Sequence, residues 1–354
     1  MHARQNNFDA LRFWAALVVL WSHAFPIAYG SEAHEPLYAL SGGQSTLGGV
    51  AVSLFFVISG YLITRSFERS ESSWTFTRAR ILRIAPALLV VLAITAFALG
   101  PIVSDHSAAE YFRSGAPYRY VLAQASFTRH IDVLSGVFAD HALPYVNASL
   151  WTLRYEVACY VLVLVLGVSR LLTRFVTLLL YLGAIAYLAV VEHLQTDLHA
   201  ELPGPDRLLD LGAKFLAGAL VYQWRVPLRA RWAWLALAVL GFTVWAGAFR
   251  SAERIVLPYA VLFVAIGTTR RLPALTRFGD LSYGTYIYAW PVSQCAVLAL
   301  AEPSWFGVGL IATPIVLALA FASFHLVEKR ALAWKAAPVR EPEPAFSAWR
   351  GPAR

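Results

Sequence analysis

The sequence predicts an all-α integral membrane protein of about ten transmembrane helices, with the N- and C-termini on the cytoplasmic side. Three observations support this prediction: the composition, the spacing of the apolar segments, and the distribution of arginine and lysine among the loops. Hydrophobic residues make up 58% of the 354-residue chain and charged residues only 14%, whereas soluble domains carry roughly 25% charged residues. Lipid is therefore expected to replace water around most of the surface.

Apolar segments approaching the roughly 20 residues of a membrane-spanning helix recur along the chain. They lie near 8–29, 46–66, 84–103, 149–169, 175–191, 208–224, 232–249, 255–269, 281–301 and 306–327. They leave no room for a soluble domain, so we expect one integral membrane domain over 1–334. Residues 335–354 are rich in proline and charge, which predicts a short, disordered cytoplasmic tail.

The loops test this topology independently. Of the 29 Lys and Arg residues, 20 lie in the termini and loops expected inside, and six lie in the loops expected outside. Positive charge accumulates on the cytoplasmic side of membrane proteins, so the split supports ten spans with both termini inside. The same rule explains the net charge of +8 without nucleic acid, which we do not expect as a partner.

Ionisable residues inside a span are costly and usually mark function. In the first segment, Arg12 and His23 are 11 residues apart, which places them about 20° from one helical face and about 16 Å apart along the axis. We expect Arg12 near the inner surface and His23 past mid-depth toward the outside. Asp9 lies one turn before Arg12 and is expected to hold it in place.

The fourth segment carries a carboxylate at a depth similar to that of His23. Glu156 lies about one and a half turns below the outer surface, and Tyr160 follows one turn later on the same face. A histidine and a carboxylate at matching depth are typical of a general base and its orienting partner. The alternative is a buried pair that only locks helices together.

Two arginines three residues apart, Arg80 and Arg83, follow the second segment on the inner side. They share a helical face, and arginine suits phosphate because its planar group donates twice. The alternatives are the positive-inside rule alone or lipid head-group binding. Ser59 and the glycine after it are small enough for close helix packing, or they make space for a substrate.

The remaining features have structural interpretations. Trp290 precedes a proline that can kink the ninth helix near a cavity, and Glu328 at the inner end of the tenth helix suggests a structural salt bridge. The long outer loop 104–150 is either a lid, an acceptor-binding surface or an ordinary solvated loop. Cys159 and Cys295 fall inside predicted spans and show no metal-ligand spacing, so we expect no metal site.

Six motifs occur in one order along the chain. They are Arg12-X10-His23, Phe55-Phe56-x-x-Ser59-Gly60-Tyr61-Leu62-Ile63, Arg80-x-x-Arg83-Ile84-x-Pro86, Asn147-x-Ser149-Leu150-Trp151-Thr152-Leu153-x-x-Glu156, Leu281-Ser282-Tyr283-Gly284-Thr285-Tyr286-Ile287-Tyr288-Ala289-Trp290-Pro291 and Val327-Glu328-Lys329. With them the sequence resembles acyltransferase family three, the O-antigen-acetylase-like membrane proteins of bacteria. Two positions depart from the family pattern: Ala289 replaces a common histidine, and Arg330 replaces a common proline.

The resemblance implies transfer of an acyl group, usually acetyl, from cytoplasmic acyl-CoA to a hydroxyl of an extracytoplasmic carbohydrate or glycoconjugate. It places such a protein in the bacterial cytoplasmic (inner) membrane. Arg12, Arg80 and Arg83 would then hold the phosphates of CoA. His23 would act as the general base or carry the acyl group briefly, with Glu156 orienting it. Because Ala289 cannot transfer a proton, His23 is the principal candidate.

The resemblance also suggests cavity-lining or structural positions. These are Asp9, Ser59, Trp151, Tyr160, Tyr283, Trp290 and Glu328. The rival functions are a glycan transporter or flippase, and a lipid-linked glycan ligase with its key residues in loop 104–150. The expected partners are membrane lipid and an outer carbohydrate acceptor, and no obligatory protein partner can be read. The identity of the acceptor, the acyl group and the oligomeric state stay open.

Overall fold

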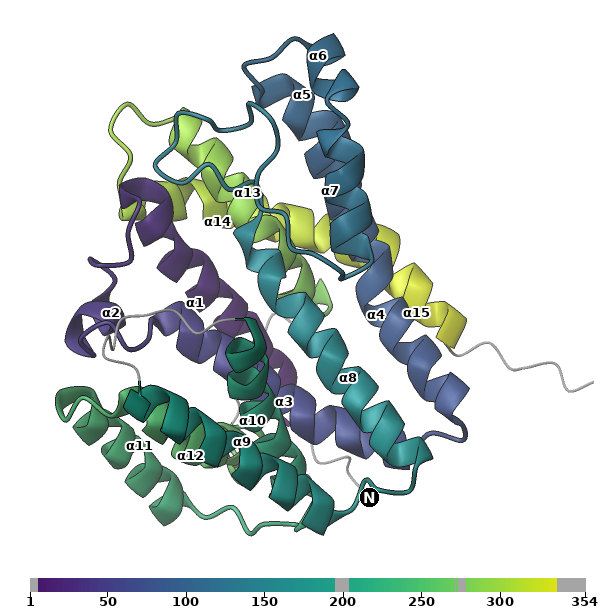
Figure 1. The fold of residues 1–354 in the computed structure, drawn as a ribbon, viewed down its shortest axis with the longest axis vertical. Helices are drawn as coiled ribbons and strands as arrows, with labels where there is room; N and C mark the ends of the chain where they lie inside the picture. Colours follow the sequence, from purple (N-terminus) through teal and green to yellow (C-terminus); the bar gives the residue numbers. More distant parts are fainter. Residues whose placement is uncertain (1–5, 195–203, 271, 273–277, 336–354) are drawn as a thin grey trace, which may run out of the picture.

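The computed structural model describes residues 6–194, 204–270, 272 and 278–335, and within these ranges it contains helices and loops but no β-strand. The all-α prediction is therefore confirmed. The predicted tail 335–354 lies outside the described residues except for Lys335, the last residue of the final helix. Figure 1 shows the helices packed into one body, with α9 to α12 gathered at the lower left.

Fifteen α-helices are described in chain order. They are α1 (Phe8–Tyr29), α2 (Pro36–Leu40), α3 (Leu47–Glu68), α4 (Ser73–Ala93), α5 (Gly100–Val103), α6 (Ala108–Arg113), α7 (Ala116–Ala125), α8 (Leu153–Val168), α9 (Arg174–Leu194), α10 (Gly204–Gln223), α11 (Ala230–Trp245), α12 (Phe249–Leu262), α13 (Ser282–Leu298), α14 (Trp305–Ser323) and α15 (Lys329–Lys335). Four short segments of other helix types adjoin them: the π-helices η1 (Ile94–Leu99), η3 (Phe263–Gly267) and η5 (Phe324–Glu328), and the 3-10 helix η2 (Ala148–Thr152).

Six of the described helical segments are long and apolar enough to cross a membrane. They are Phe8–Tyr29, Leu47–Glu68, Ser73–Val103, Ala148–Val168, Arg174–Leu194 and Trp305–Trp334. The other four apolar segments of the sequence coincide with α10, α11, α12 with η3, and α13. The chain is thus a membrane protein with six candidate spans, and a helix lies at each of the ten expected positions.

The third span begins earlier than expected. We predicted an inner loop up to residue 83, but α4 already begins at Ser73, because the Ser72 side chain caps it by accepting a hydrogen bond from the Thr75 N–H. Arg80 and Arg83 therefore lie on the helix rather than in a loop. This change matters for the site, since a helix fixes the direction of both side chains.

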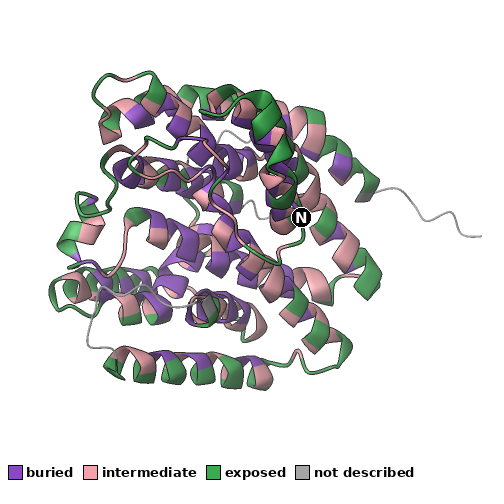
Figure 2. Ribbon diagram, turned by 45° about the horizontal axis from the view of Figure 1, so that its top comes forward, coloured by how far each residue is buried: buried purple, intermediate pink, exposed green. Residues whose placement is uncertain are grey.

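The centre of the molecule is formed by α1, which packs against α3, α13 and α14. In Figure 2 buried residues concentrate in this central region, and exposed residues mark the outer faces of the peripheral helices. On one side α3 packs along α10, and on the other side α4 and α8 contact α13 or α3. The central helices carry most of the motif residues, so the site is assembled around α1.

The crossing of α3 over α10 is unusually close. A Cβ atom on Gly60 would lie 1.8 Å from the carbonyl oxygen of Phe215, and one on Gly218 would lie 2.1 Å from that of Val57. Only glycine permits this backbone approach. The packing interpretation of the Ser59–Gly60 pair is therefore supported at Gly60, while the Ser59 side chain lines a cavity.

The segment 104–150 is built into the fold rather than merely solvated. It contains α6, whose start is a reciprocal cap between Ser107 and Glu110, and α7, which packs on α4. The side chain of Tyr111 is fully buried and donates a hydrogen bond to the carbonyl of Ala96. An isolated bridge joins Ser104 to Val137, so the segment returns to its starting point before η2 begins.

Candidate active site

Two cavities lie at opposite ends of the Arg12–His23 stretch of α1. The first, which we call the arginine cavity, has a volume of about 260 Å³ and is lined by residues of α1, α3, α4, α8 and α13. Its polar lining comprises Arg12, Ser59, Arg80, Arg83, Glu156, Tyr160, Asp280, Ser282 and Tyr283. The helices therefore bring together most of the polar residues that the motifs singled out.

The arginines of this cavity differ in their partners. Arg83 NH2 lies 2.5 Å from Asp280 Oδ2, and its NH1 lies 3.5 Å from Glu328 Oε2. Burial acts to raise the pKa of Asp280, but Arg83 and Arg12 stabilise its carboxylate more strongly and hold that pKa below its usual value. Arg83 is therefore neutralised by two carboxylates, and Glu328 forms the kind of salt bridge that its position suggested.

Arg80 and Arg12 are the available cations of the cavity. The Nε atom of Arg80 is buried without a hydrogen-bond partner, and its guanidinium lies 5.8 Å from the centre of the Phe76 ring. Within the described part of the chain, Arg12 forms neither an ion pair nor a hydrogen bond, and the expected pairing with Asp9 is not formed. Two unpaired guanidinium groups facing one cavity favour an anionic ligand.

Glu156 belongs to the arginine cavity. Its Oε1 accepts hydrogen bonds from the Tyr160 hydroxyl and, at 3.3 Å, from Ser59 Oγ. No hydrogen bond or ion pair joins it to His23 in the described residues. Ser149 contacts His23, and Glu156 follows it by seven residues, three steps in the 3-10 turn η2 and four in α8. At rises of 2.0 and 1.5 Å per residue this places Glu156 about 12 Å further along the axis, so it lines the other cavity.

The second cavity, which we call the histidine cavity, has a volume of about 620 Å³. His23 lines it, with its Nδ1 atom 3.5 Å from Ser149 Oγ and its ring centroid 5.0 Å from that of Trp290, edge to face. The Trp290 indole is fixed by a hydrogen bond of 2.8 Å from Nε1 to the carbonyl of Tyr145. Trp151 also lines this cavity.

Loop 104–150 contributes to the same cavity. His130 and Asp132 line it as an ion pair, and His130 Nδ1 lies 3.2 Å from Gln124 Oε1. The Gln124 amide nitrogen donates to the carbonyl of Ile131, which orients its oxygen toward His130. Both ring nitrogens are therefore engaged, so this histidine orders the loop and has no free lone pair for proton abstraction.

One buried side chain is shared by the linings of the two cavities. Val52 of α3 is 7% exposed and lines both of them. In η2 the adjacent residues Trp151 and Thr152 line the histidine cavity and the arginine cavity, respectively. We refer to Val52, Trp151 and Thr152 as the wall between the cavities. The arrangement could pass a small group from one cavity to the other while keeping two larger molecules apart.

Sequence reasoning missed several residues of this site. Asp280 carried a detectable signal, because an aspartate can bond to the backbone two residues on, and its Oδ1 accepts from the backbone N–H and hydroxyl of Ser282. Lys214 falls inside the predicted span 208–224, but the sequence does not show which carboxylates it meets. Val52 could not be singled out from the sequence, because valine is common in apolar helices and nothing in the sequence distinguishes this one.

Tyr283 and Trp290 both come from α13 but serve different cavities. The Tyr283 hydroxyl donates to the carbonyl of Ile84 at 2.9 Å, which ties α13 to α4 beside the arginines. Two turns further along, Trp290 faces His23. A single helix thus forms one side of both cavities.

Comparison with known proteins agrees with this architecture. The family model described as an acyltransferase domain matches residues 5–325. The chain is 32% identical over 341 residues to an O-acetyl transferase of Shigella phage Sf6, covering 94% of this chain and 97% of that protein. It is 29% identical over 355 residues to nodulation protein 10 of Rhizobium leguminosarum bv. viciae, covering 93% of each. No solved structure matches the chain.

Proposed function

Because the chain belongs to the acyltransferase family whose domain model matches residues 5–325, and is thus a membrane enzyme that moves groups other than aminoacyl groups, we propose that it O-acylates a carbohydrate. The donor is acyl-CoA, with acetyl as the default acyl group, and the acceptor is a hydroxyl of an extracytoplasmic glycan or glycoconjugate. The observation that carries the proposal is the pair of cavities whose linings share Val52.

The proposed topology has ten spans with both termini in the cytoplasm of a bacterium, and the protein resides in its inner membrane. Residues 1–334 form the single membrane domain and 335–354 a short tail. The support is the correspondence between the ten apolar segments and the helices, together with the bias of Lys and Arg toward alternate loops. In this topology the arginine cavity faces the cytoplasm and the histidine cavity faces outward.

The arginine cavity suits the phosphates of CoA. Arg12 and Arg80 form no ion pair with a carboxylate in the described residues, and the buried Nε of Arg80 has no hydrogen-bond acceptor there. Both guanidinium groups can therefore bind phosphate. Arg83, already paired with Asp280 and Glu328, holds α4 against α13 and η5 and so shapes the cavity. This division assigns phosphate binding to two of the three arginines that the sequence suggested.

In the proposed reaction His23 acts from the acceptor side. It accepts the proton of the acceptor hydroxyl while the hydroxyl oxygen bonds to the acyl carbon and the carbon–sulfur bond of the thioester breaks. The proton then passes to the departing thiolate. Ser149 takes the orienting role that we expected of Glu156, because its hydroxyl faces His23 Nδ1. Transfer through a brief acyl-His23 intermediate uses the same residues.

Mass spectrometry of surface glycans tests the proposal. We would compare cells with the gene, without it, with His23→Ala and with His106→Ala, whose histidine is exposed and lines neither cavity. We expect one acyl unit per sugar repeat in the wild type and the His106 variant, and none in the other two, at equal protein abundance. Full acylation by His23→Ala would exclude its catalytic role, and identical glycans in all strains would favour a glycan transporter.

A further inference from the structure

We propose that a cluster of buried and half-buried charges on α10 and α12 is the acceptor-binding part of the histidine cavity, and that it selects an uncharged sugar. The cluster, which we call the acceptor wall, consists of Asp210, Lys214, Arg250 and Glu253, all of which line this cavity. This inference rests on the proposed function, because it assigns the acceptor that the acyl group reaches.

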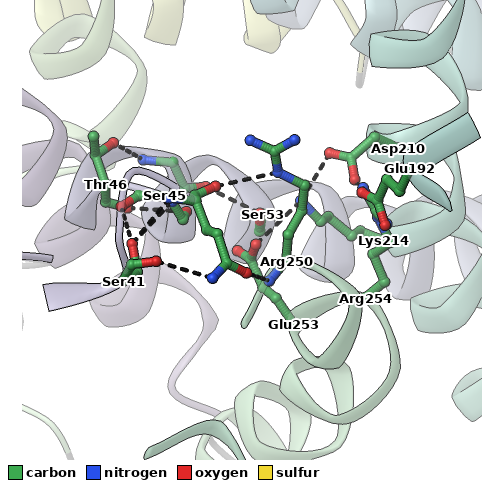
Figure 3. Close-up of polar contacts among 12 residues, drawn as sticks. Ser41, Ser45, Thr46, Ser53, Glu192, Asp210, Lys214, Arg250, Glu253 and Arg254 are labelled. Carbon is green, nitrogen blue, oxygen red and sulfur yellow. Dashed lines mark hydrogen bonds and ion pairs between the residues drawn. The ribbon is translucent and has the colours of Figure 1, made fainter. Parts of the chain in front are cut away.

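The acceptor wall is held by ion pairs among buried side chains. Lys214 Nζ lies 2.9 Å from Asp210 Oδ2 and 3.5 Å from Glu253 Oε2. Behind it, outside the cavity lining, Arg254 bonds to Asp210 at 2.5 Å and to Glu192 at 2.7 Å. Figure 3 shows these contacts running from Glu192 to Glu253. Charges are rarely buried in a membrane domain unless they face a polar cavity or a pathway.

The unpaired carboxylate oxygen of Glu253 indicates a ligand-binding site. The residue is 2% exposed, and although its Oε2 faces Lys214, its Oε1 is buried with no hydrogen-bond partner. An unpaired carboxylate oxygen is costly unless a donor reaches it. Because Glu253 lines the cavity, the hydroxyl of a bound molecule is well placed to supply that donor.

Arg250 adds donors at the edge of the wall. Its backbone N–H and its Nε bond to Gln44, which fixes the side chain against the 41–46 loop. Its two terminal nitrogens have no partner among the described residues, and Figure 3 shows them projecting from the anchored stem. The wall therefore presents both an acceptor, Glu253 Oε1, and donors, as a polyhydroxyl ligand requires.

The lining of the cavity also contains two tryptophans. Trp290 packs against His23, and Trp151 lines the cavity as well. Apolar rings with a few fixed polar groups are typical of small-molecule sites. The cavity volume of about 620 Å³ falls within the range of roughly 300 to 1,000 Å³ found for such sites. The Arg207 guanidinium lies 5.4 Å from the centre of the Trp151 ring, so the aromatic lining also brings a polar group to the cavity.

The charge of the lining argues for a neutral sugar. Among the described lining residues the carboxylates are Glu32, Asp132, Asp210 and Glu253, and the Lys and Arg side chains are Arg207, Lys214 and Arg250. The carboxylates are more numerous than the Lys and Arg side chains, so the cavity offers no excess positive charge to an anionic sugar. The arginine cavity, which we assign to phosphates, differs because three of the five charged side chains in its lining are arginines.

The test separates binding from structural support, using two carboxylates of one network. Transfer is measured in membrane vesicles with acetyl-CoA and with de-O-acylated surface glycan from the same cells. Glu253→Gln should raise the KM for glycan about tenfold or more, the loss expected for a hydrogen bond to a charged group, and leave the KM for acetyl-CoA unchanged. Arg250→Gln should also raise the KM for glycan. It provides a second test if Glu253→Gln does not fold.

The matched control is Glu192→Gln, which loses a partner of Arg254 without touching the cavity lining. It should lower the thermal stability and leave the KM for glycan unchanged.

An unchanged KM for glycan in both Glu253→Gln and Arg250→Gln would overturn the inference while the proposed function stands. If the wild-type protein transfers no acetyl group to the glycan, both the inference and the proposed function are overturned. A preference for uronic-acid over neutral oligosaccharides would refute the selection of uncharged sugars.

Discussion

Arg80 and Arg83 lie one turn apart on α4, yet their surroundings assign them different tasks. Arg83 is bound by Asp280 and Glu328, and the Glu328 side chain is only 2% exposed. Arg80 has a buried Nε without a partner and faces the same cavity. Sequence alone treats them as an equivalent pair, because both sit on one face at helical spacing.

A pair of alanine variants distinguishes these tasks. Arg80→Ala should raise the KM for acetyl-CoA about tenfold or more, because a charge-assisted hydrogen bond to phosphate is lost, with little change in thermal stability. Arg83→Ala should instead destabilise the fold by about 3–5 kcal/mol, because it leaves the buried Glu328 carboxylate uncompensated. Steady-state kinetics and thermal unfolding in detergent measure the two effects. Equal losses of stability in both variants would contradict the division.

The residues around His23 show how far sequence reasoning reaches at this scale. Its presence on the Arg12 face of one helix follows from helical periodicity, and the two residues indeed line cavities at different depths. The partner of His23 does not follow, because Ser149, and not Glu156, lies beside it. The sequence gives the order of residues along the fourth span, but not how deep that span sits against α1, so it could not tell which of the two reaches His23.

At the scale of elements, the positions of the helices were predictable and their limits were not. Long apolar runs fix where helices form, because a spanning segment must satisfy all its backbone groups internally. The start of α4 depends on the Ser72 cap, and the order of segment 104–150 depends on distant contacts such as Tyr111 with Ala96. Local composition contains little of that information.

The crossing of α3 and α10 yields a prediction about packing. In Gly60→Ala the new methyl group would meet the carbonyl of Phe215 at 1.8 Å, so the two backbones must separate. We expect a destabilisation of about 3 kcal/mol and a loss of activity, because α3 also carries Ser59 and Val52. Thermal unfolding and acyl transfer measure both effects.

Gly212→Ala on α10, the other helix of this crossing, is the control, since a Cβ atom there would meet nothing within 4 Å. It should leave activity intact and stabilise the fold by about 0.5–1 kcal/mol, the usual gain of alanine over glycine inside a helix. If both alanine variants unfold at the wild-type temperature, the close crossing does not limit stability.

At the scale of the whole molecule, the proposed transfer between the two cavities predicts that Val52, which lines both, governs acyl size. Val52→Phe should slow acetyl transfer, on the order of 100-fold, by displacing the reacting groups. Val52→Ala should raise the rate with butyryl-CoA relative to acetyl-CoA. Initial rates with both donors give the ratio. Val190→Ala, on an exposed position of α9, should leave the ratio unchanged, and an unchanged ratio in both Val52 variants would exclude passage at this wall.

In the proposed topology the wall at Val52 also has to insulate the membrane electrically. Water that fills both cavities would concentrate the transmembrane voltage across this wall, where moving one elementary charge through 100 mV involves about 2.3 kcal/mol. A wider opening would admit hydronium and metal ions as readily as a longer acyl chain, and the cell would lose proton-motive force through its own enzyme. In that topology, ion leakage as well as chemistry would limit the largest group that can be transferred.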